Sequence, residues 1–335
     1  MDMLEVISTS GFSSFQDMGR NGFRSQGISR SGAADYYALF EGAALLDQNP
    51  NSTALELIGN GGKFRVLQDC MVALTGAIMP ASLDQKPLSW NSSHYLHGGS
   101  ILELGAPQNG RYSYLHLRGG FKAPKIFNSC SAQPSAGIGK YTRPKDILEP
   151  LEKIPEALKC QTIEPVDRFE STSCRLVESF QTHLFTPKTL KKFVDTEFTI
   201  DNQANRGGMK LAHTGSGFSS SNQLKIVSEM IIPGDIQMTG SGQPFVLLSD
   251  CQTMGGYPRI GCIIPPDLPA IAQLKTGRTV KFKFISRDEA NRITSNDRKS
   301  LEIIKERCLE SIRDPQKMAD LLNFNLIDGA VWAKN

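Results

Sequence analysis

Short apolar stretches, each followed by a polar or glycine-rich turn, recur along the first part of the chain at intervals of about 10 residues. Residues 55–58 and 63–66 flank a turn of glycine and asparagine at 59–62, and this pattern predicts a β-hairpin. Within residues 111–117, tyrosine and histidine side chains alternate with serine and leucine side chains. This alternation predicts a strand with both faces partly covered. Repeated short strands at this spacing are typical of a β-barrel or a β-sandwich.

One helix is predicted within this strand-rich part. Ser31 is expected to cap its amino end, and Asp35 adds a favourable charge in the first turn. Residues 49–50, an Asn-Pro pair, are expected to end the helix. The apolar face falls at positions i, i+3, i+4 and i+7, which are Tyr36, Leu39, Phe40 and Ala43.

Strand patterns resume in the second part of the chain near residues 174–177, 198–200 and 280–285. Ser286 and Glu289 then form a capping box, which predicts the start of a helix. Helical spacing of apolar residues continues this helix through Leu301, Ile304, Cys308 and Ile312. We therefore expect a β-rich half over 1–125, an irregular connection over 126–173, a β-rich half over 174–285 and a helical tail over 286–335.

Composition narrows the classes of function. The chain has 335 residues, 39% of them hydrophobic and 21% charged, with a net charge of +3. The basic residues are scattered, which argues against a nucleic-acid partner. The sequence contains no apolar run of about 18 residues, so no membrane span is predicted. The acidic start lacks a signal-peptide pattern, and seven cysteines without a Cys-x-x-Cys pair favour reduced thiols in the cytoplasm and no zinc or other metal site.

Polar side chains gather at glycine turns in segments 15–35, 202–208 and 233–258. In the last segment, an apolar strand at 245–248 leads directly into Asp250 and a run of polar residues and glycines. One interpretation is a buried strand followed by a glycine turn, and the other is a site that holds a small polar ligand against backbone amides. The arginines of these segments can bind a carboxylate or pair with nearby aspartates, and both options stay open. Cys251 is a better nucleophile candidate by position than any of the histidines, although a cysteine at the end of a strand is usually a small core residue.

Three sequence blocks are specific enough to compare with known families. They are Gln16-Asp17-x-Gly19-Arg20 with Ser31-Gly32-x-x-Asp35, then Asn205-Arg206-x-Gly208-Met209, and finally Asp250-x-Gln252-Thr253-x-Gly255-Gly256-Tyr257-Pro258. Over about residues 5–285 the chain resembles the allophanate hydrolase subunit 2 family. That family includes KipA, the C subunit of 5-oxoprolinase and part of the carboxyltransferase domain of urea carboxylase.

The resemblance implies a mainly β fold of two cyclophilin-like β-barrel halves related by pseudo-two-fold symmetry, with few helices and a helical C-terminal tail. It also implies action on a small amide or lactam. Catalysis is then expected from Asp250, Gln252 and Thr253. Substrate binding is expected from Arg20, Ser31, Asp35, Arg206, Gln237, Gln243, Gly255, Gly256 and Tyr257.

The function implied first is a subunit of an ATP-dependent 5-oxoprolinase, which converts 5-oxoproline to glutamate. Its expected partners are an allophanate hydrolase subunit 1-like (B-type) subunit and a LamB/YcsF-type A subunit. ATP would act in the complex, because this chain has no recognisable ATP motif. Two alternatives stay open: the carboxyltransferase component of a biotin-dependent urea or amide carboxylase, and a KipA-like regulatory binding protein.

Overall fold

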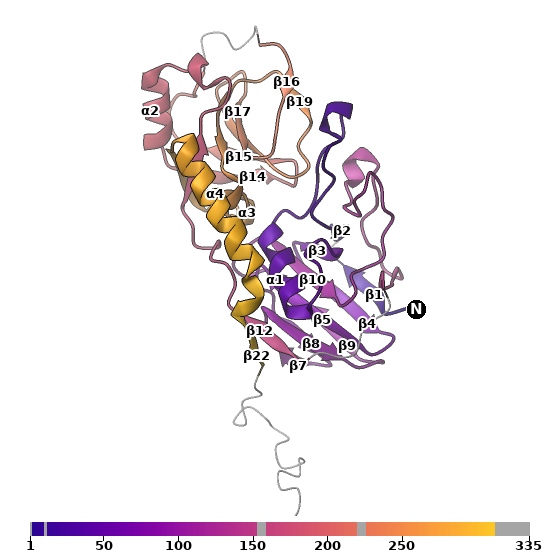
Figure 1. The fold of residues 1–335 in the computed structure, drawn as a ribbon. Coiled ribbons are helices and arrows are strands. Elements are labelled where there is room, and N and C mark those ends of the chain that lie inside the picture. Colours follow the sequence, from indigo (N-terminus) through magenta and orange to yellow (C-terminus); the bar gives the residue numbers. More distant parts are fainter. Residues whose placement is uncertain (1, 10–11, 153–158, 220–225, 312–335) are drawn as a thin grey trace, which may run out of the picture.

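Two β-rich halves and four α-helices make up the part of the chain that the computed structural model describes, which is residues 2–9, 12–152, 159–219 and 226–311 (Figure 1). The barrel half lies at the top of Figure 1 and the first half at the bottom. The mainly β fold predicted from the sequence is confirmed. The pseudo-two-fold relation between the halves stays a prediction.

The first half contains two antiparallel sheets. A six-stranded sheet has the order β11-β1-β4-β9-β6-β7, with β1 Leu4–Thr9, β4 Gly62–Val66, β6 Ala81–Leu83, β7 Lys86–Leu88, β9 Ile101–Leu104 and β11 Ile147–Leu148. A seven-stranded sheet has the order β2-β3-β10-β5-β8-β12-β22, with β2 Ser14–Gln16, β3 Ala54–Ile58, β5 Cys70–Gly76, β8 Ser92–Leu96, β10 Tyr112–Leu117, β12 Gln161–Ile163 and β22 Cys308–Glu310. A buried apolar cluster from both sheets joins them.

The predicted hairpin at 55–66 is wrong. Its two strands belong to different sheets, because β3 pairs with β2 and β10 while β4 pairs with β1 and β9. The glycines between them carry the chain from one sheet to the other. A Cβ atom on Gly62 would lie only 2.4 Å from the carbonyl oxygen of Ser8, so the close crossing requires glycine there.

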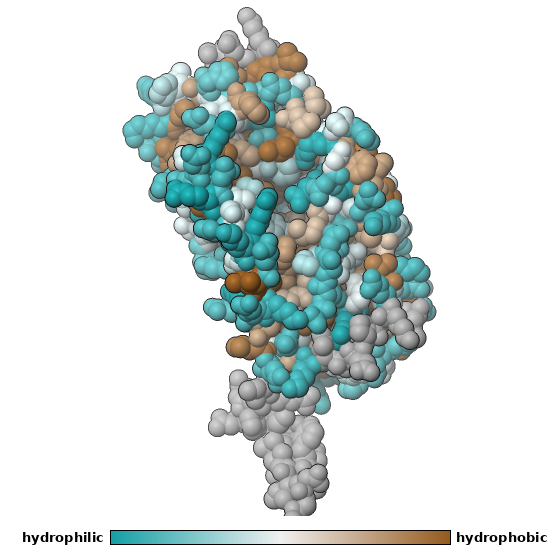
Figure 2. Space-filling view, viewed as in Figure 1, coloured by the Kyte–Doolittle hydropathy of each residue, from teal (hydrophilic) through white to brown (hydrophobic). Residues whose placement is uncertain are grey.

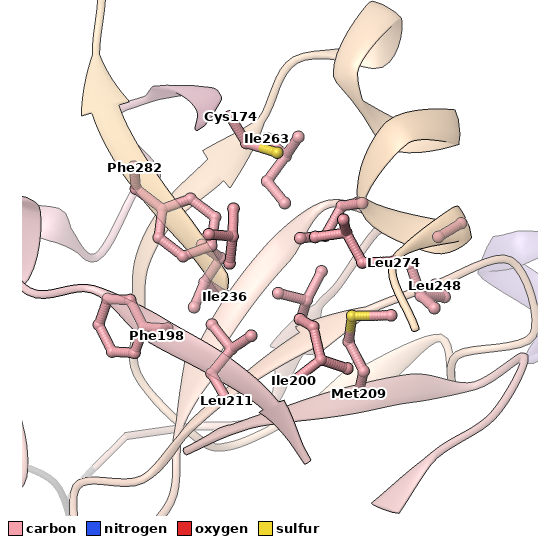
Figure 3. Close-up of a cluster of buried hydrophobic side chains, with 14 of the residues drawn as sticks. Cys174, Phe198, Ile200, Met209, Leu211, Ile236, Leu248, Ile263, Leu274 and Phe282 are labelled. Atoms are coloured by element: carbon pink, nitrogen blue, oxygen red, sulfur yellow. The ribbon is translucent and has the colours of Figure 1, made fainter. Parts of the chain in front are cut away.

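The second half is a closed seven-stranded barrel with the order β13-β20-β17-β18-β15-β14-β21. Its strands are β13 Ser173–Val177, β14 Phe198–Ala204, β15 Gly208–Ala212, β17 Asp235–Met238, β18 Pro244–Leu247, β20 Arg259–Ile263 and β21 Thr279–Phe284. Figure 3 shows the interior filled by side chains such as Ile236, Met209 and Phe282. A short two-stranded antiparallel sheet of β16 (Glu229–Met230) and β19 (Met254–Gly255) lies beside the barrel.

The first helix, α1, spans Tyr36–Leu46, and Asp35 rather than Ser31 is its N-cap. Ser31 lies too far from the helix to cap it, and its hydroxyl instead donates to Asp250. The last helical residue, Leu46, lies three residues before the Asn-Pro pair, and Asp47 in the left-handed region is the C-cap. Leu39 and Ala43 of the predicted inward face are buried, whereas Tyr36 and Phe40 are only half-buried, so the predicted face is confirmed only in part. The residues predicted to bound the helix are wrong.

Two short helices, α2 (Pro187–Asp195) and α3 (Leu268–Gln273), belong to the barrel half. The longest helix, α4 (Arg287–Glu302), runs along one side of the molecule towards the first half (Figure 1). Ser286 accepts the backbone N–H of Glu289 at 3.1 Å, as the capping box predicts.

The prediction that the helix continues through Cys308 is wrong, and residue 312 lies outside the described residues. After a 3₁₀ turn at Ile304–Arg307 the chain continues as β22, which pairs with β12 at the edge of the seven-stranded sheet. Pairing with a strand requires extended backbone, so the helix cannot continue here. Two strands of the predicted irregular connection, β11 and β12, also belong to the sheets of the first half.

The face seen in Figure 2 is mostly hydrophilic, with apolar residues in small groups. None of the helices in the described ranges is both long and apolar enough to cross a membrane.

Candidate functional site

A pocket of about 680 Å³ lies against the outside of the barrel. Side chains alternate along a strand, and Ile236 and Val246 belong to the barrel core, so their neighbours Gln237, Phe245 and Leu247 face outward. We call this space the outer-wall pocket. It is lined by Asn202, Gln203, Ala204, Asn205, Gly207, Gly208, Gln237, Thr239, Phe245, Leu247, Asp250, Cys251, Gln252 and Tyr257.

Four of the residues predicted to act in catalysis or substrate binding line this pocket together: Gln237, Asp250, Gln252 and Tyr257. The nucleophile candidate Cys251 also lines it. The side chain of Gln252 is exposed and Tyr257 is 50% exposed, so both are accessible from solvent. Gln237 is only 4% exposed, and its Nε2 has no hydrogen-bond partner among the described residues. The 250–258 segment therefore borders a pocket, as the ligand-binding interpretation requires.

Behind the pocket, Asp250 is held in a buried network of charges between the two halves. Arg206 donates to both carboxylate oxygens of Asp250, from Nε at 2.8 Å and from Nη2 at 3.0 Å. The hydroxyl of Ser31 donates to Asp250 Oδ1 at 2.6 Å. We call the group of Ser31, Glu56, Arg206, Asp250 and the carbonyl of Gly32 the sealed network.

The other side of Arg206 faces the first half. Its Nη1 donates to Glu56, which is fully buried, and its Nη2 donates to the carbonyl oxygen of Gly32 at 2.6 Å. Glu56 also accepts the hydroxyl of Tyr114 at 2.7 Å and the N–H of Ala34 at 2.9 Å. Every charge in this cluster has an opposite charge and hydrogen bonds, so the network joins the halves.

The electrostatics of the sealed network follow from burial and pairing. Burial opposes the charge of Arg206, but the carboxylates of Glu56 and Asp250 outweigh it and hold the pKa of Arg206 well above its usual value. Burial raises the pKa of the neighbouring Tyr112 hydroxyl to about 12. Arg206 is thus a fixed cation that is already neutralised, which leaves it little capacity to bind a substrate carboxylate.

Asp35 lies in a second buried cluster, away from the outer-wall pocket. Its carboxylate accepts Arg168 Nε at 2.6 Å and Gln273 Nε2 at 2.7 Å. Arg168 also forms a bidentate pair with Glu41, at 2.8 Å for each bond. These contacts give Asp35 a clear structural task, since it caps α1 and ties the helix to Arg168.

The remaining predicted residues are not part of the pocket lining. Arg20 is 2% exposed and donates to the carbonyl of Ser131, while its Nε and Nη1 have no partner in the described ranges. Gln243 lies 3.3 Å from a ring nitrogen of His213. Thr253 is buried, and Gly255 and Gly256 follow it in the loop.

Cys251 is buried with Ile231 and Leu247. Burial raises the pKa of its thiol to about 11, so the thiol is protonated at neutral pH. A protonated, enclosed thiol is a weak nucleophile, so the structure favours the interpretation of Cys251 as a core residue over that of a nucleophile. The described residues also contain no group of three or more His, Cys, Asp or Glu that is placed to hold a metal ion.

Two kinds of residue at the site are not among the predicted site residues. The first comprises the pocket amides Asn202, Gln203 and Asn205, although the polar character of segment 202–208 pointed to their position. Asn205 is partly committed, because its Oδ1 accepts the N–H groups of Gly207 and Gly208. The second is Glu56, a charged residue in an otherwise apolar strand, which marks a buried charge that needs a partner.

Known proteins are similar to this chain in both sequence and fold. Residues 26–284 match the family described as carboxyltransferase domain, subdomain A and B. The C subunit of 5-oxoprolinase from Haemophilus influenzae is 31% identical over 308 residues, which cover 90% of this chain and 98% of that protein. Its counterpart from Escherichia coli, also a 5-oxoprolinase C subunit, is 31% identical over 304 residues, which cover 90% and 97%.

A solved structure extends the likeness to the fold. The urea carboxylase of Kluyveromyces lactis superposes with a TM-score of 0.79 at 21% identity, over 93% of this chain. This chain spans only 31% of that longer protein. From the family match and its 31% identical relatives, the chain belongs to the carboxyltransferase subdomain A and B family, which also contains the C subunits of 5-oxoprolinases.

Proposed function

We propose that this chain is the C-type subunit of an ATP-dependent 5-oxoprolinase, which hydrolyses the lactam of 5-oxoproline to glutamate. Its partners are an allophanate hydrolase subunit 1-like (B-type) subunit and a LamB/YcsF-type A subunit. The observation that carries the proposal is the match to two proteins that are named as C subunits of 5-oxoprolinase, over 98% and 97% of their lengths.

The outer-wall pocket suits the part of this task that concerns the lactam. An amide carbonyl is a poor electrophile, so the protein must orient the planar group and stabilise negative charge on its oxygen. Gln252 offers an exposed side-chain amide for this contact, and Asp250 is held rigidly beside it. In this proposal Asp250 and Gln252 act at the lactam, while Thr253 supports the loop.

ATP is assigned to the partner subunits. The residues that line the outer-wall pocket do not fit a triphosphate, because none of them is a lysine or an arginine. We propose that the complex works in the cytoplasm, and the seven free cysteines of the chain support this location, because a reducing compartment keeps thiols unpaired.

A second candidate is the carboxyltransferase component of a biotin-dependent urea or amide carboxylase. The fold likeness to a urea carboxylase over 93% of this chain favours it. The lower identity of that match, 21% against 31%, places it second. Biotin would be the cofactor only under this alternative, and a KipA-like regulator without catalysis is the third option.

Reconstitution tests the proposal. The chain is mixed with B-type and A-type subunits, ATP and 5-oxoproline, and glutamate is measured by an enzyme-coupled assay. We expect glutamate only when all three subunits and ATP are present. No glutamate from the complete mixture, or equal glutamate when this chain is left out, overturns the proposal.

Gln252→Ala sharpens the assignment of the pocket. We expect the variant complex to lose glutamate release by at least about 100-fold, since one well-placed hydrogen-bond donor to a developing oxyanion contributes that much to catalysis. The variant should keep the melting temperature of the parent chain, because Gln252 is exposed. Gln68→Ala, at an exposed glutamine far from the pocket lining, is the matched control and should retain full turnover.

A further inference from the structure

Gln237 presents a buried hydrogen-bond donor that no described group uses. It lies in β17, and its backbone pairs with Phe245 on one side and Arg259 on the other. Its side chain faces outward into the outer-wall pocket, is 4% exposed, and leaves Nε2 without a partner in the described part of the chain. Buried amide groups in folded proteins nearly always have partners, so an unused donor at a pocket wall points to a ligand acceptor.

The space around this donor depends on Gly255. A Cβ atom at Gly255 would lie 2.7 Å from Gln237 Nε2 and 3.1 Å from Ile231 Cδ1. The backbone of Gly255 is not in the left-handed region, so its conformation does not require glycine. Glycine at this position therefore serves to leave room for the amide of Gln237.

The chemistry of the lining limits what the acceptor can be. The polar side chains are mainly amides, and the single carboxylate, Asp250, is already paired with Arg206 and Ser31. With no lysine or arginine in the lining, an anionic group would be desolvated there without a counter-charge. A neutral, planar carbonyl with an N–H beside it fits this surface, and any carboxylate of the same ligand must point away from it.

We propose that Gln237 Nε2 donates to the carbonyl oxygen of a neutral amide, lactam or ureido group bound in the outer-wall pocket, and that Gly255 leaves the space which this amide needs. Gln237 is then the residue that selects for the carbonyl. The naming of 5-oxoproline as the natural ligand rests on the proposed function, whereas the preference for a neutral carbonyl rests on the pocket alone.

Direct binding to the full chain tests this inference without any turnover. The probes are 5-oxoproline, the neutral lactam 2-pyrrolidinone, and proline, which lacks the ring carbonyl, each titrated while protein NMR shifts are followed. Both lactams should bind, alone or with the B-type subunit present, and proline should not. Absence of lactam binding in both settings overturns the inference.

Three variants locate the contact. Gln237→Leu should weaken lactam binding by at least 10-fold, equivalent to about 1.4 kcal/mol. Gly255→Ala, which displaces the amide without removing it, should weaken binding by about 3- to 10-fold. Gly240→Ala is the matched control, because Gly240 is exposed, has nothing within 4 Å of an added Cβ and has an ordinary backbone conformation.

The outcomes separate this inference from the proposed function. Parental affinity in Gln237→Leu, or equal weakening in Gly255→Ala and Gly240→Ala, overturns the role of Gln237. If lactam binding depends on Gln237 but the complete complex releases no glutamate, the proposed function falls and this inference stands. If the Gln237→Leu complex turns over 5-oxoproline normally, the inference falls and the proposed function stands.

Discussion

The sealed network and the outer-wall pocket share one residue, Asp250, but they differ in whether their polar groups have hydrogen-bond partners. In the network, the charges of Arg206 and Glu56 are buried and fully partnered. In the pocket, Gln252 is exposed and Gln237 keeps a buried donor without a described partner. Groups that are satisfied stabilise the fold, and groups that are left unsatisfied are available to a ligand.

Asp250 belongs to both regions and is held in place through its side chain and its backbone. Its side chain is fixed by the sealed network, its N–H donates to the carbonyl of Arg206 at 2.9 Å, and its carbonyl accepts Gln133 Nε2 at 3.3 Å. The loop that carries Gln252 therefore starts from an immobile point. A rigid support of this kind holds the pocket residues in place before a ligand arrives.

The largest effect is expected where the sealed network loses a charge. Glu56→Gln keeps the size of the side chain but removes one of the two carboxylates that neutralise Arg206. Arg206 keeps Asp250 as its counter-charge, but an amide cannot accept from Arg206, Tyr114 and Ala34 as the carboxylate does. A charge-assisted hydrogen bond is lost and a buried donor is left unpaired, at a cost of about 3 kcal/mol. Chemical denaturation should show this loss in the free energy of unfolding.

Glu103→Gln is the matched control for that variant. Glu103 pairs with Lys63 at 3.0 Å, but both side chains are at least 40% exposed, so the loss should stay below about 1 kcal/mol. Equal losses in the two variants would show that the sealed network contributes no more than a surface pair. The contrast between the two regions would then have no energetic basis.

A smaller effect is expected at the edge of the sealed network. Ser31→Ala removes the hydroxyl that donates to Asp250 and leaves the positive φ of 52° unchanged. A hydrogen bond to a charged group contributes about 1.5–3 kcal/mol, and thermal unfolding should report a loss near the lower end of that range. The same change at exposed Ser89 should have almost no effect. If Ser31→Ala keeps full stability but loses ligand affinity, Ser31 belongs with the pocket instead.

Local pattern was sufficient to predict much of the fold. Alternation located strands β10 and β21, and the capping residue Ser286 located the start of α4. The hairpin at 55–66 failed because pairing depends on which sheet a strand enters, and that is decided by contacts with distant strands β1 and β10. Short-range pattern carries no information about such partners.

The candidate site also has features that local pattern predicts and features that it does not. Gln237 and Gln252 could be predicted, since polar residues beside glycine turns mark a surface that a ligand can reach. The separation of Asp35 from Asp250 could not, because both are aspartates in glycine-rich blocks. Only the three-dimensional partners, Arg168 for one and Arg206 for the other, assign them to different clusters.

The smallest change in the free energy of unfolding is expected in the pocket. There the free energy should stay the same or rise, whereas substitutions in the sealed network should lower it. Gln237→Leu removes a buried donor that has no described partner, so the folded state loses no hydrogen bond from Nε2 and no longer buries that polar group unpaired. We expect the free energy of unfolding without ligand to stay the same or to rise by up to about 1 kcal/mol. Added lactam should raise the melting temperature of the parent chain but not that of the variant, because a ligand stabilises only a form that binds it. A loss of about 2 kcal/mol or more would mean that Gln237 is part of the structural framework, like Glu56, and that a satisfied polar group had been mistaken for an available one.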